Sequence, residues 1–228
     1  MRVELDPRLR LILVTDGRGD LGRIDEVVAG AMEGGCRCVQ LREPGWSARR
    51  FEAACARLLP ALERVGGALL VNDRVDLACA DLAHGAQVGH RSLTPAAARE
   101  ALGVRGLLGY SAHDARELEE AAAAGCDFAV LAPIWQTASK PGVTPLGVAA
   151  AGELTAGASL PVVWLGGVSV AHSAHLRGLP AGRCPAGLAA MGALMAAADP
   201  AEVAAALLAD LDGCALDPAR RGDDAART

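Results

Sequence analysis

The sequence predicts a single (β/α)8 barrel. Short apolar runs recur along nearly the whole chain, most of them end in polar or glycine residues, and alanine-rich stretches with helical spacing separate them. Eight such alternations are what a TIM barrel requires, and that fold places its active site where the strands end. The runs cover residues 11–16, 38–43, 68–73, 86–90, 107–113, 128–133, 162–167 and 186–192. An open doubly wound sheet shares the alternation, but eight units and the glycines after the last two runs favour closure.

The stretches between the runs carry helix signals. Ile24, Val27, Val28 and Ala31 form an apolar stripe within residues 24–34. Three helices begin at capping residues, which are Ser47 for residues 47–64, Thr94 before Pro95 for residues 95–102, and Asp114 with Glu117 as a capping box. The remaining helices are expected at residues 75–82, 146–156, 169–177 and 200–212. We assign residues 1–213 to the barrel and predict a disordered tail over 214–228.

Composition limits the function classes. The chain has 228 residues, of which 52% are apolar, so it suits one barrel with a sizeable core. Its formal net charge of −5 argues against a nucleic-acid partner. No apolar run is long enough to span a bilayer, and the first residues lack the pattern of a secretory signal. We expect a cytoplasmic enzyme with no membrane partner.

The seven cysteines are scattered. Cys36 and Cys38 form a C-x-C pair, but no second Cys or His pair lies at zinc spacing. We expect buried thiols of a reducing compartment rather than a metal site.

Glycines follow the seventh and eighth runs, where these barrels usually bind phosphate. Gly166 and Gly167 allow close approach of backbone amides to an anion, and Met191, Gly192 and Ala193 would complete the site. Two ordinary tight turns are the alternative, and the pairing at both runs favours phosphate.

Polar side chains close the second and third runs. Gln40 and Arg42 alternate, so both point to one face of their strand. An arginine facing into the barrel requires an anion, or else an ion pair with Glu43 or Asp73. Asp73 suits Mg²⁺ binding or pairing with Arg42, but Asn72-Asp73 is also common in turns, and taken alone the turn interpretation is favoured.

Histidines close the fourth and fifth runs. His113 precedes the Asp114 cap, where a helix N-terminus disfavours the cationic imidazole and leaves a general base. An ordinary loop residue is the alternative, and His90 is a second candidate. His84, His172 and His175 look like helix or surface residues.

A long loop at residues 134–145 follows the sixth run. Its Pro and Gly content suggests a lid over the site, with a solvated loop as the alternative. Its side chains suited to oxyanions are Gln136, Thr137, Ser139 and Lys140.

Several motifs resemble the thiamine phosphate synthase / TenI family over roughly residues 11–212. In chain order they are VQLRE, LLVND, GYSAHD, the P-x-x-x-T-A-S-K loop, VVWLGG and the A-D-P before the last helix. The resemblance implies one of two activities. A synthase joins a pyrimidine diphosphate to a carboxythiazole phosphate with Mg²⁺ and releases pyrophosphate, whereas a TenI-like tautomerase moves a proton in the thiazole phosphate without a metal. Such barrels are often homodimers.

The chain departs from the synthase pattern at three positions. Pro44 stands where a lysine meets the diphosphate, Ser92 stands where an aspartate binds Mg²⁺, and Gln87 replaces the histidine of the fourth strand. The S-x-H motif remains as Ser111-Ala112-His113. Losing a lysine and a metal ligand could cost a synthase several kcal/mol of transition-state stabilisation.

These departures lead us to expect a thiazole tautomerase with no cofactor, in which His113 transfers the proton. The substrate-binding residues expected with it are Gln40, Arg42, Asn72, Ser111, Thr137, Ser139, Lys140, Gly166, Gly167, Met191 and Gly192. The first alternative is a synthase in which Arg42, Asn72, Thr137, Ser139 and Lys140 hold the diphosphate and Asp73 binds Mg²⁺. The second is a non-catalytic regulator that binds thiazole or thiamine phosphates. An unrelated sugar-phosphate epimerase would need a set of metal-binding His and Asp residues that we do not find.

Overall fold

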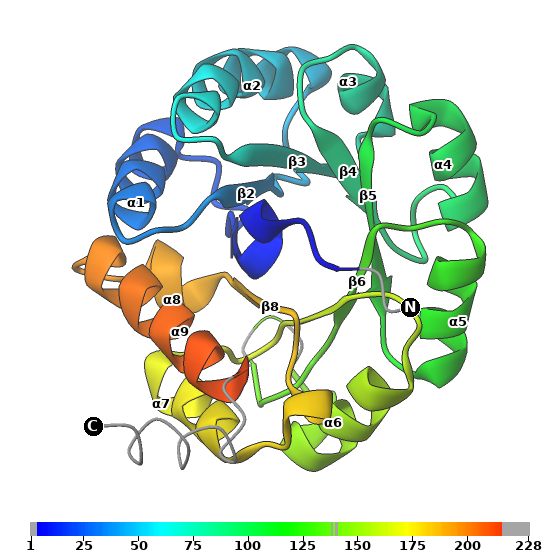
Figure 1. The fold of residues 1–228 in the computed structure, drawn as a ribbon. Helices are drawn as coiled ribbons and strands as arrows, with labels where there is room; N and C mark the ends of the chain where they lie inside the picture. The colour runs from blue at the N-terminus through cyan, green and yellow to red at the C-terminus, as the bar shows by residue number, and fades with distance from the viewer. Residues whose placement is uncertain (1–3, 138, 140, 216–228) are drawn as a thin grey trace, which may run out of the picture.

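Eight parallel strands form a closed barrel in the computed structural model, which describes residues 4–137, 139 and 141–215. Each strand pairs with the next along the chain, and β8 pairs with β1 to close the ring, which Figure 1 shows in a view along the barrel. The predicted (β/α)8 barrel is therefore confirmed, and the open sheet is excluded. The strands are β1 (Leu11–Val14), β2 (Cys38–Leu41), β3 (Ala68–Asn72), β4 (Gly85–Val88), β5 (Leu107–Ala112), β6 (Phe128–Leu131), β7 (Val162–Trp164) and β8 (Gly187–Ala190).

Helices cover the outside of the ring (Figure 1). The α-helices are α1 (Leu21–Glu33), α2 (Ala48–Glu63), α3 (Val75–Cys79), α4 (Pro95–Leu102), α5 (Ala115–Ala123), α6 (Gly147–Gly157), α7 (Val170–Ser173), α8 (Gly192–Met195) and α9 (Pro200–Ala215). Short 3-10 helices are η1 (Pro7–Arg10), η2 (Ala174–Gly178) and η3 (Ala181–Arg183). The predicted caps are confirmed, because the side chains of Ser47, Thr94 and Asp114 each accept a bond from the first turn of their helix.

Two helix predictions differ from the structure. The helix expected at 169–177 is a short α7 followed by the 3-10 turn η2, and α8 was not expected at all. The capping residue of α8 is Met191, which makes no side-chain capping bond. A four-residue helix without a polar cap has no distinctive sequence signal.

The barrel interior follows the alternation of the strands. On β1, Ile12 and Val14 point into the ring and pack in the inner cluster, while Leu11 and Leu13 pack against the surrounding helices. Phe128 of β6 fills the inner cluster and lies against Gly109 of β5. A Cβ atom on Gly109 would lie 2.4 Å from the Phe128 ring, so this strand position requires glycine.

The cysteine prediction is partly wrong. Cys36 and Cys38 are buried thiols, as expected, and burial raises the pKa of Cys36 to about 11. Cys184 and Cys214, however, form a disulfide that ties the end of α9 to the loop before β8. Their separation of 30 residues gives no local signal for pairing.

Helix α9 continues to Ala215, beyond the predicted end of the barrel at residue 213. Residues 216–228, which make up most of the predicted disordered tail, lie outside the described residues. Among the described helices, none combines the length and the apolar composition needed to cross a bilayer.

Candidate functional site

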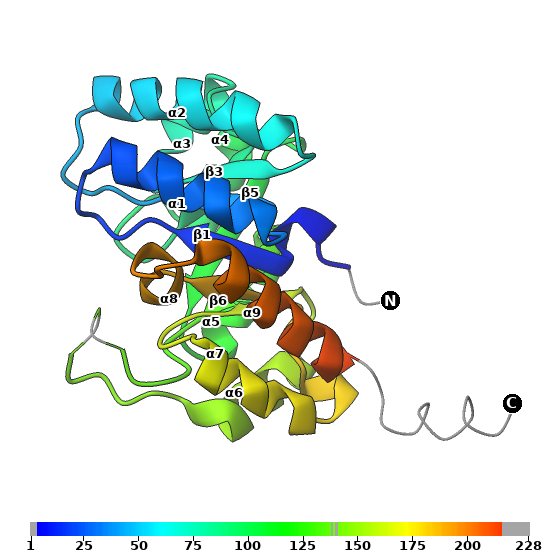
Figure 2. The same ribbon diagram turned by 90° about the vertical axis from the view of Figure 1, so that its left-hand side faces the viewer.

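A cavity of about 720 Å³ lies at the end of the barrel where the strands finish. Figure 2 shows the loop between β6 and α6 at this end and η1 at the opposite end of the barrel. All predicted site residues except Lys140 line this cavity, while Lys140 lies outside the described residues. They are Gln40, Arg42, Asn72, Asp73, Ser111, His113, Thr137, Ser139, Gly166, Gly167, Met191 and Gly192.

Polar side chains from β2 to β5 form hydrogen-bonded pairs in the cavity. Gln40 Nε2 donates to Asn72 Oδ1 at 2.9 Å, and Gln87 Nε2 donates to Ser111 Oγ at 2.9 Å. Gln87 is only 2% exposed, and its Oε1 has no hydrogen-bond partner among the described residues. A buried acceptor of this kind is costly unless a ligand supplies a donor.

Arg42 forms neither of the ion pairs that the sequence left open. Glu43 is buried and accepts bonds from the backbone amides of Gly17 and Gly19, at 3.2 and 2.8 Å. Asp73 Oδ2 accepts a bond from Asn72 Nδ2 at 2.6 Å. Within the described part of the chain, the Arg42 guanidinium has no carboxylate partner. The guanidinium is therefore available to an anion in the cavity.

Two further arginines line the same cavity and were not predicted. Arg18 comes from the loop after β1, and Arg91 comes from the loop after β4. Arg91 directly precedes Ser92, the aspartate position of the family pattern, and closure of the ring brings both loops to the cavity that Arg42 lines. Arg18 pairs with Asp16 at 3.4 Å and its side chain is 75% exposed, so Arg42 and Arg91 are the guanidinium groups of this cavity without a carboxylate partner among the described residues.

Asp16 also lines the cavity but is committed to Arg23. Arg23 donates to both carboxylate oxygens, at 3.2 and 2.8 Å. Burial opposes ionisation of Asp16, but the bonds from Arg23 and from the Arg18 amide outweigh it and lower the pKa of the carboxyl. Asp16 is therefore an ionised group that orders the loop after β1.

Backbone amides line the cavity on the β7 and β8 side. The amides of Gly167, Val168, Gly192 and Ala193 donate to no acceptor among the described residues, although all four residues line the cavity. Backbone donors without partners at a cavity wall are suited to an oxyanion. A Cβ on Gly192 would meet nothing within 4 Å, so the space beside its amide is open.

Gly166 and Gly167 also have a structural role. Their φ angles are 95° and 70°, which L-residues rarely adopt. A Cβ on Gly167 would lie 2.5 Å from the Gln136 carbonyl oxygen, so this turn packs tightly against the loop after β6. The tight-turn and phosphate interpretations are compatible, because one backbone conformation meets both requirements.

His172, expected to be a helix or surface residue, lies in α7 and also lines the cavity, which the sequence did not predict. Its Nδ1 lies 2.6 Å from the Gly167 carbonyl oxygen, and its ring stacks on Trp135 at 5.3 Å with an interplanar angle of 3°. The amide N–H of Val168 belongs to the same planar peptide as that carbonyl and points the opposite way. His172 therefore helps to orient the Val168 amide.

His113 lies on the β5 side of the cavity next to Glu117. Its Nδ1 lies 2.9 Å from Glu117 Oε2, and its backbone N–H donates to the same oxygen at 2.7 Å. The His90 ring stacks on His113 with centroids 5.2 Å apart. The predicted capping box is confirmed only at Asp114, because Glu117 bonds to residue 113 instead of the cap itself.

Thr137 and Ser139 lie over the β8 side of the cavity. Ser139 Oγ lies 3.8 Å from Met191 Sδ, so the loop after β6 reaches the residue that follows β8. This contact brings the Ser139 hydroxyl to the residue that precedes Gly192.

The described residues fit a magnesium ion that is held together with a phosphorylated substrate. Asp73 keeps one carboxylate oxygen without a partner among the described residues. Ser92 does not replace the missing aspartate, because its hydroxyl bonds to both the amide and the carbonyl of Gly89 at 2.8 Å. Mg²⁺ commonly takes one or two carboxylates plus substrate phosphates, so Asp73 alone is sufficient on the protein side.

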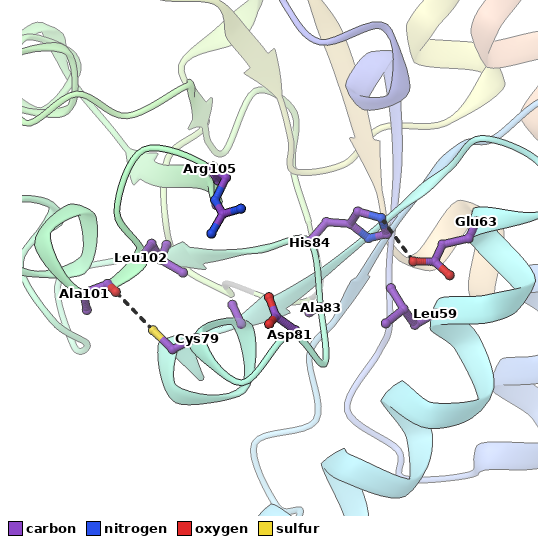
Figure 3. A pocket seen from close by; sticks show the side chains of 11 residues that line it. Leu59, Glu63, Cys79, Asp81, Ala83, His84, Ala101, Leu102 and Arg105 are labelled. Carbon is purple, nitrogen blue, oxygen red and sulfur yellow. Dashed lines mark hydrogen bonds and ion pairs between the residues drawn. The ribbon is translucent and has the colours of Figure 1, made fainter.

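A second cavity, of about 500 Å³, lies at the opposite end of the barrel (Figure 3). His84 and Gly106, which line it, immediately precede β4 and β5. Two of the labelled side chains already have partners in the fold, since Leu69 N–H donates to His84 Nδ1 at 3.1 Å and Cys79 Sγ lies 3.4 Å from the Ala101 carbonyl oxygen. Residues at this end of a TIM barrel usually contribute to stability rather than to catalysis.

Comparisons with known proteins agree with this geometry. Residues 11–193 match the family model described as thiamine monophosphate synthase. The chain is 36% identical over 210 residues to the thiamine-phosphate synthase of Laribacter hongkongensis, covering 92% of this chain and 97% of that protein. It is 42% identical over 162 residues to the thiamine-phosphate synthase of Salinispora tropica, covering 71% and 73%.

A solved thiamine phosphate pyrophosphorylase from Pyrococcus furiosus has the same fold, with a TM-score of 0.78 and 23% identity over 91% of this chain and 97% of that one. The expectation of a TenI-like tautomerase is wrong, because the relatives over most of the chain are named thiamine-phosphate synthase. The physical reason is that two lost charged positions do not empty the site, because Arg42, Asp73 and Arg91 still line the cavity.

Proposed function

The chain belongs to the thiamine monophosphate synthase family, and on that premise we propose that it is a thiamine-phosphate synthase. It would join a pyrimidine that carries a diphosphate to a thiazole phosphate and release pyrophosphate. The bond between the pyrimidine unit and its diphosphate breaks, and the bond to the thiazole ring forms. Such a reaction needs two separate anion-binding regions within one cavity.

The observation that carries this proposal is the presence of two such regions across the ring. The amides of Gly167, Val168, Gly192 and Ala193 lie at the ends of β7 and β8 and suit the single phosphate of the thiazole. Arg42 lies after β2 and suits the diphosphate, with Asn72 as a hydrogen-bond donor beside it. In an eight-stranded ring, β3 and β7 stand opposite each other.

The leaving diphosphate determines what the side chains must do. Negative charge develops on it as its bond to the pyrimidine unit breaks, so fixed cations at its position stabilise the transition state. Arg42 and Arg91 would supply those cations from the ends of β2 and β4, while Arg18 lines the same cavity but pairs with Asp16. They support the proposal that this chain replaces the lysine of the family pattern with arginines.

Asp73 would hold Mg²⁺ when the diphosphate is bound, and the ion would neutralise part of the developing charge. The buried Oε1 of Gln87 would accept a hydrogen bond from a donor on the bound substrate ring. The hydroxyl groups of Thr137 and Ser139 would cover the cavity from the β6 side.

The test is reconstitution of the reaction. We expect the purified protein to form thiamine phosphate and pyrophosphate in equal amounts from the pyrimidine diphosphate, the thiazole phosphate and Mg²⁺. Omitting either organic substrate serves as the control and should abolish both products. Pyrophosphate release that does not require the thiazole phosphate, or no product at all, would contradict the proposal.

A further inference from the structure

Three metal-ligating side chains gather at the rim between β4 and β5. They are His90 from the loop after β4, His113 from the end of β5, and Glu117 from α5. One ligand atom from each residue lies within 4.8 Å of the other two. The proposed synthase reaction assigns no step to this cluster, and Asp73, which would hold Mg²⁺, is not part of it.

The distances match a site that closes around a small ion. Zinc bonds of about 2.0–2.1 Å at tetrahedral angles separate neighbouring ligand atoms by about 3.3 Å. Here His113 Nδ1 lies 2.9 Å from Glu117 Oε2, and His90 Nδ1 lies 3.9 Å from Glu117 Oε1. The two distances end at different oxygens of Glu117, so its carboxylate would bind the ion through both oxygens or rotate to offer one of them.

The three side chains differ in how exposed they are, and this difference would help them to enclose an ion. The Glu117 side chain is 11% exposed and the His113 side chain 31%, so two ligands are held in place by their surroundings. The His90 side chain is 56% exposed and is free to rotate toward them. Two fixed ligands and one adjustable ligand make a partly preorganised site.

The donor set selects the type of ion. Two imidazole nitrogens and one carboxylate oxygen suit Zn²⁺ and Co²⁺, whereas Mg²⁺ prefers oxygen ligands alone. His90 and His113 both line the cavity, so a fourth position on the ion would face the interior. Arg116 lies 3.7 Å from Glu117 and opposes cation binding, but its side chain is 73% exposed and can move away.

We propose that His90, His113 and Glu117 form a binding site for a borderline divalent transition-metal ion such as Zn²⁺ or Co²⁺, separate from the Mg²⁺ position at Asp73. Binding replaces the hydrogen bond between the His113 ring and Glu117 with two metal bonds. The imidazole nitrogens must be unprotonated to bind, so affinity falls as the pH drops.

The test uses Co²⁺ as a spectroscopic probe of the full-length protein after treatment with a chelator. Cys79 is the exposed free thiol of the described chain, so a Cys79→Ser background removes adventitious thiolate binding. We expect one Co²⁺ per chain, with visible absorption bands typical of four-coordinate nitrogen and oxygen ligands. His90→Ala should weaken the affinity by about 100-fold or more, since losing even an outer-shell partner costs 10–100-fold.

His175→Ala is the matched control, because His175 is an exposed histidine outside the cluster. It should bind Co²⁺ as tightly as the parent protein. Glu117→Gln should also lose the bands, and a thermal melt checks that this variant remains folded. Equal affinity in His90→Ala and the parent, or no stoichiometric binding, would overturn the proposal. None of these readouts depends on turnover, so the result is independent of the proposed synthase activity.

Discussion

The two ends of the barrel use arginine in opposite ways. At the end where the strands finish, Arg42 lines the cavity and has no carboxylate partner among the described residues. At the other end, Arg99 of α4 donates to the carbonyl oxygens of Gly103, Gly106 and Gly125 and to Asp127, at 2.7–2.9 Å. The first end, here called the open end, has an arginine available to a ligand. At the second, here called the closed end, the arginine holds loops together through hydrogen bonds. Function and stability should therefore separate between the two ends.

Substitution of Arg42 tests the open end. Arg42→Gln should lower kcat/KM for thiamine phosphate formation by roughly 100–1000-fold, because one donor aimed at developing negative charge contributes about that factor. The melting temperature should change little, since the guanidinium has no ion pair with any described residue to lose. Steady-state kinetics at saturating thiazole phosphate, together with a thermal melt, measure both quantities. A large drop in melting temperature with unchanged kinetics would show that Arg42 serves stability rather than function.

Substitution of Arg99 tests the closed end. The Arg99 side chain is only 18% exposed, and Arg99→Gln leaves several carbonyls and the Asp127 carboxylate with fewer donors. We expect the free energy of unfolding to fall by about 3 kcal/mol. Urea denaturation measures this change, and kcat/KM per folded molecule should stay at the wild-type value. Unchanged stability would show that these bonds are exchanged for equally good bonds to water.

The sequence predicted the barrel because its signals repeat. Eight apolar runs, capping residues such as Ser47 and Asp114, and the glycine pair at 166–167 all indicated the same architecture. Features with a single weak signal were missed. Helix α8 has four residues and no polar cap, and the Cys184–Cys214 disulfide joins residues that only the packing of α9 brings together.

The site was predicted to the extent that strand alternation controls it. Gln40 and Arg42 share a face of one strand and its extension, and both do line the cavity. The hydrogen-bond partner of Glu43 was not predictable from the sequence. Glu43 accepts bonds from amides of the loop after β1 instead of pairing with Arg42. His172 looked like an ordinary helix residue, and its place beside Gly167 depends on how the loop after β7 folds. Loop positions of this kind depend on tertiary packing rather than on local pattern.

Gln87 offers a smaller and sharper test of the open end. Gln87→Met removes a buried acceptor that has no partner among the described residues, along with one bond to Ser111. Since an unsatisfied buried group costs about 1–3 kcal/mol and a hydrogen bond contributes about 1 kcal/mol, stability should stay level or rise by up to about 1 kcal/mol. The KM for one substrate should rise by roughly 2–10-fold if that substrate donates to Oε1.

Gln40→Met is the matched control for Gln87, because the Gln40 amide is paired with Asn72. It should lower stability by about 1 kcal/mol, since Asn72 Oδ1 loses its donor. Urea denaturation and substrate titration of both variants separate the two cases. Equal stability losses in the two variants would contradict the idea that Gln87 is held in place for a ligand.

The smallest expected effect lies at the closed end, in the pH dependence contributed by His84. Burial lowers the pKa of His84 below its usual 6.5, and Arg8 adds to this effect, while Glu63 at 4.0 Å and Asp6 oppose it. The unfolded chain therefore binds more protons near pH 6 than the folded protein does, so this part of the stability is complete above pH 6.5 and declines as the pH falls. In the folded protein Nδ1 also accepts a bond from the Leu69 amide, which a ring protonated at that nitrogen cannot do. His84→Asn keeps an acceptor near that position and does not titrate, so urea midpoints should fall less between pH 7.5 and 5.5 in the variant than in the wild type. Parallel pH profiles would mean that the His84 ring turns out to solvent when it is protonated.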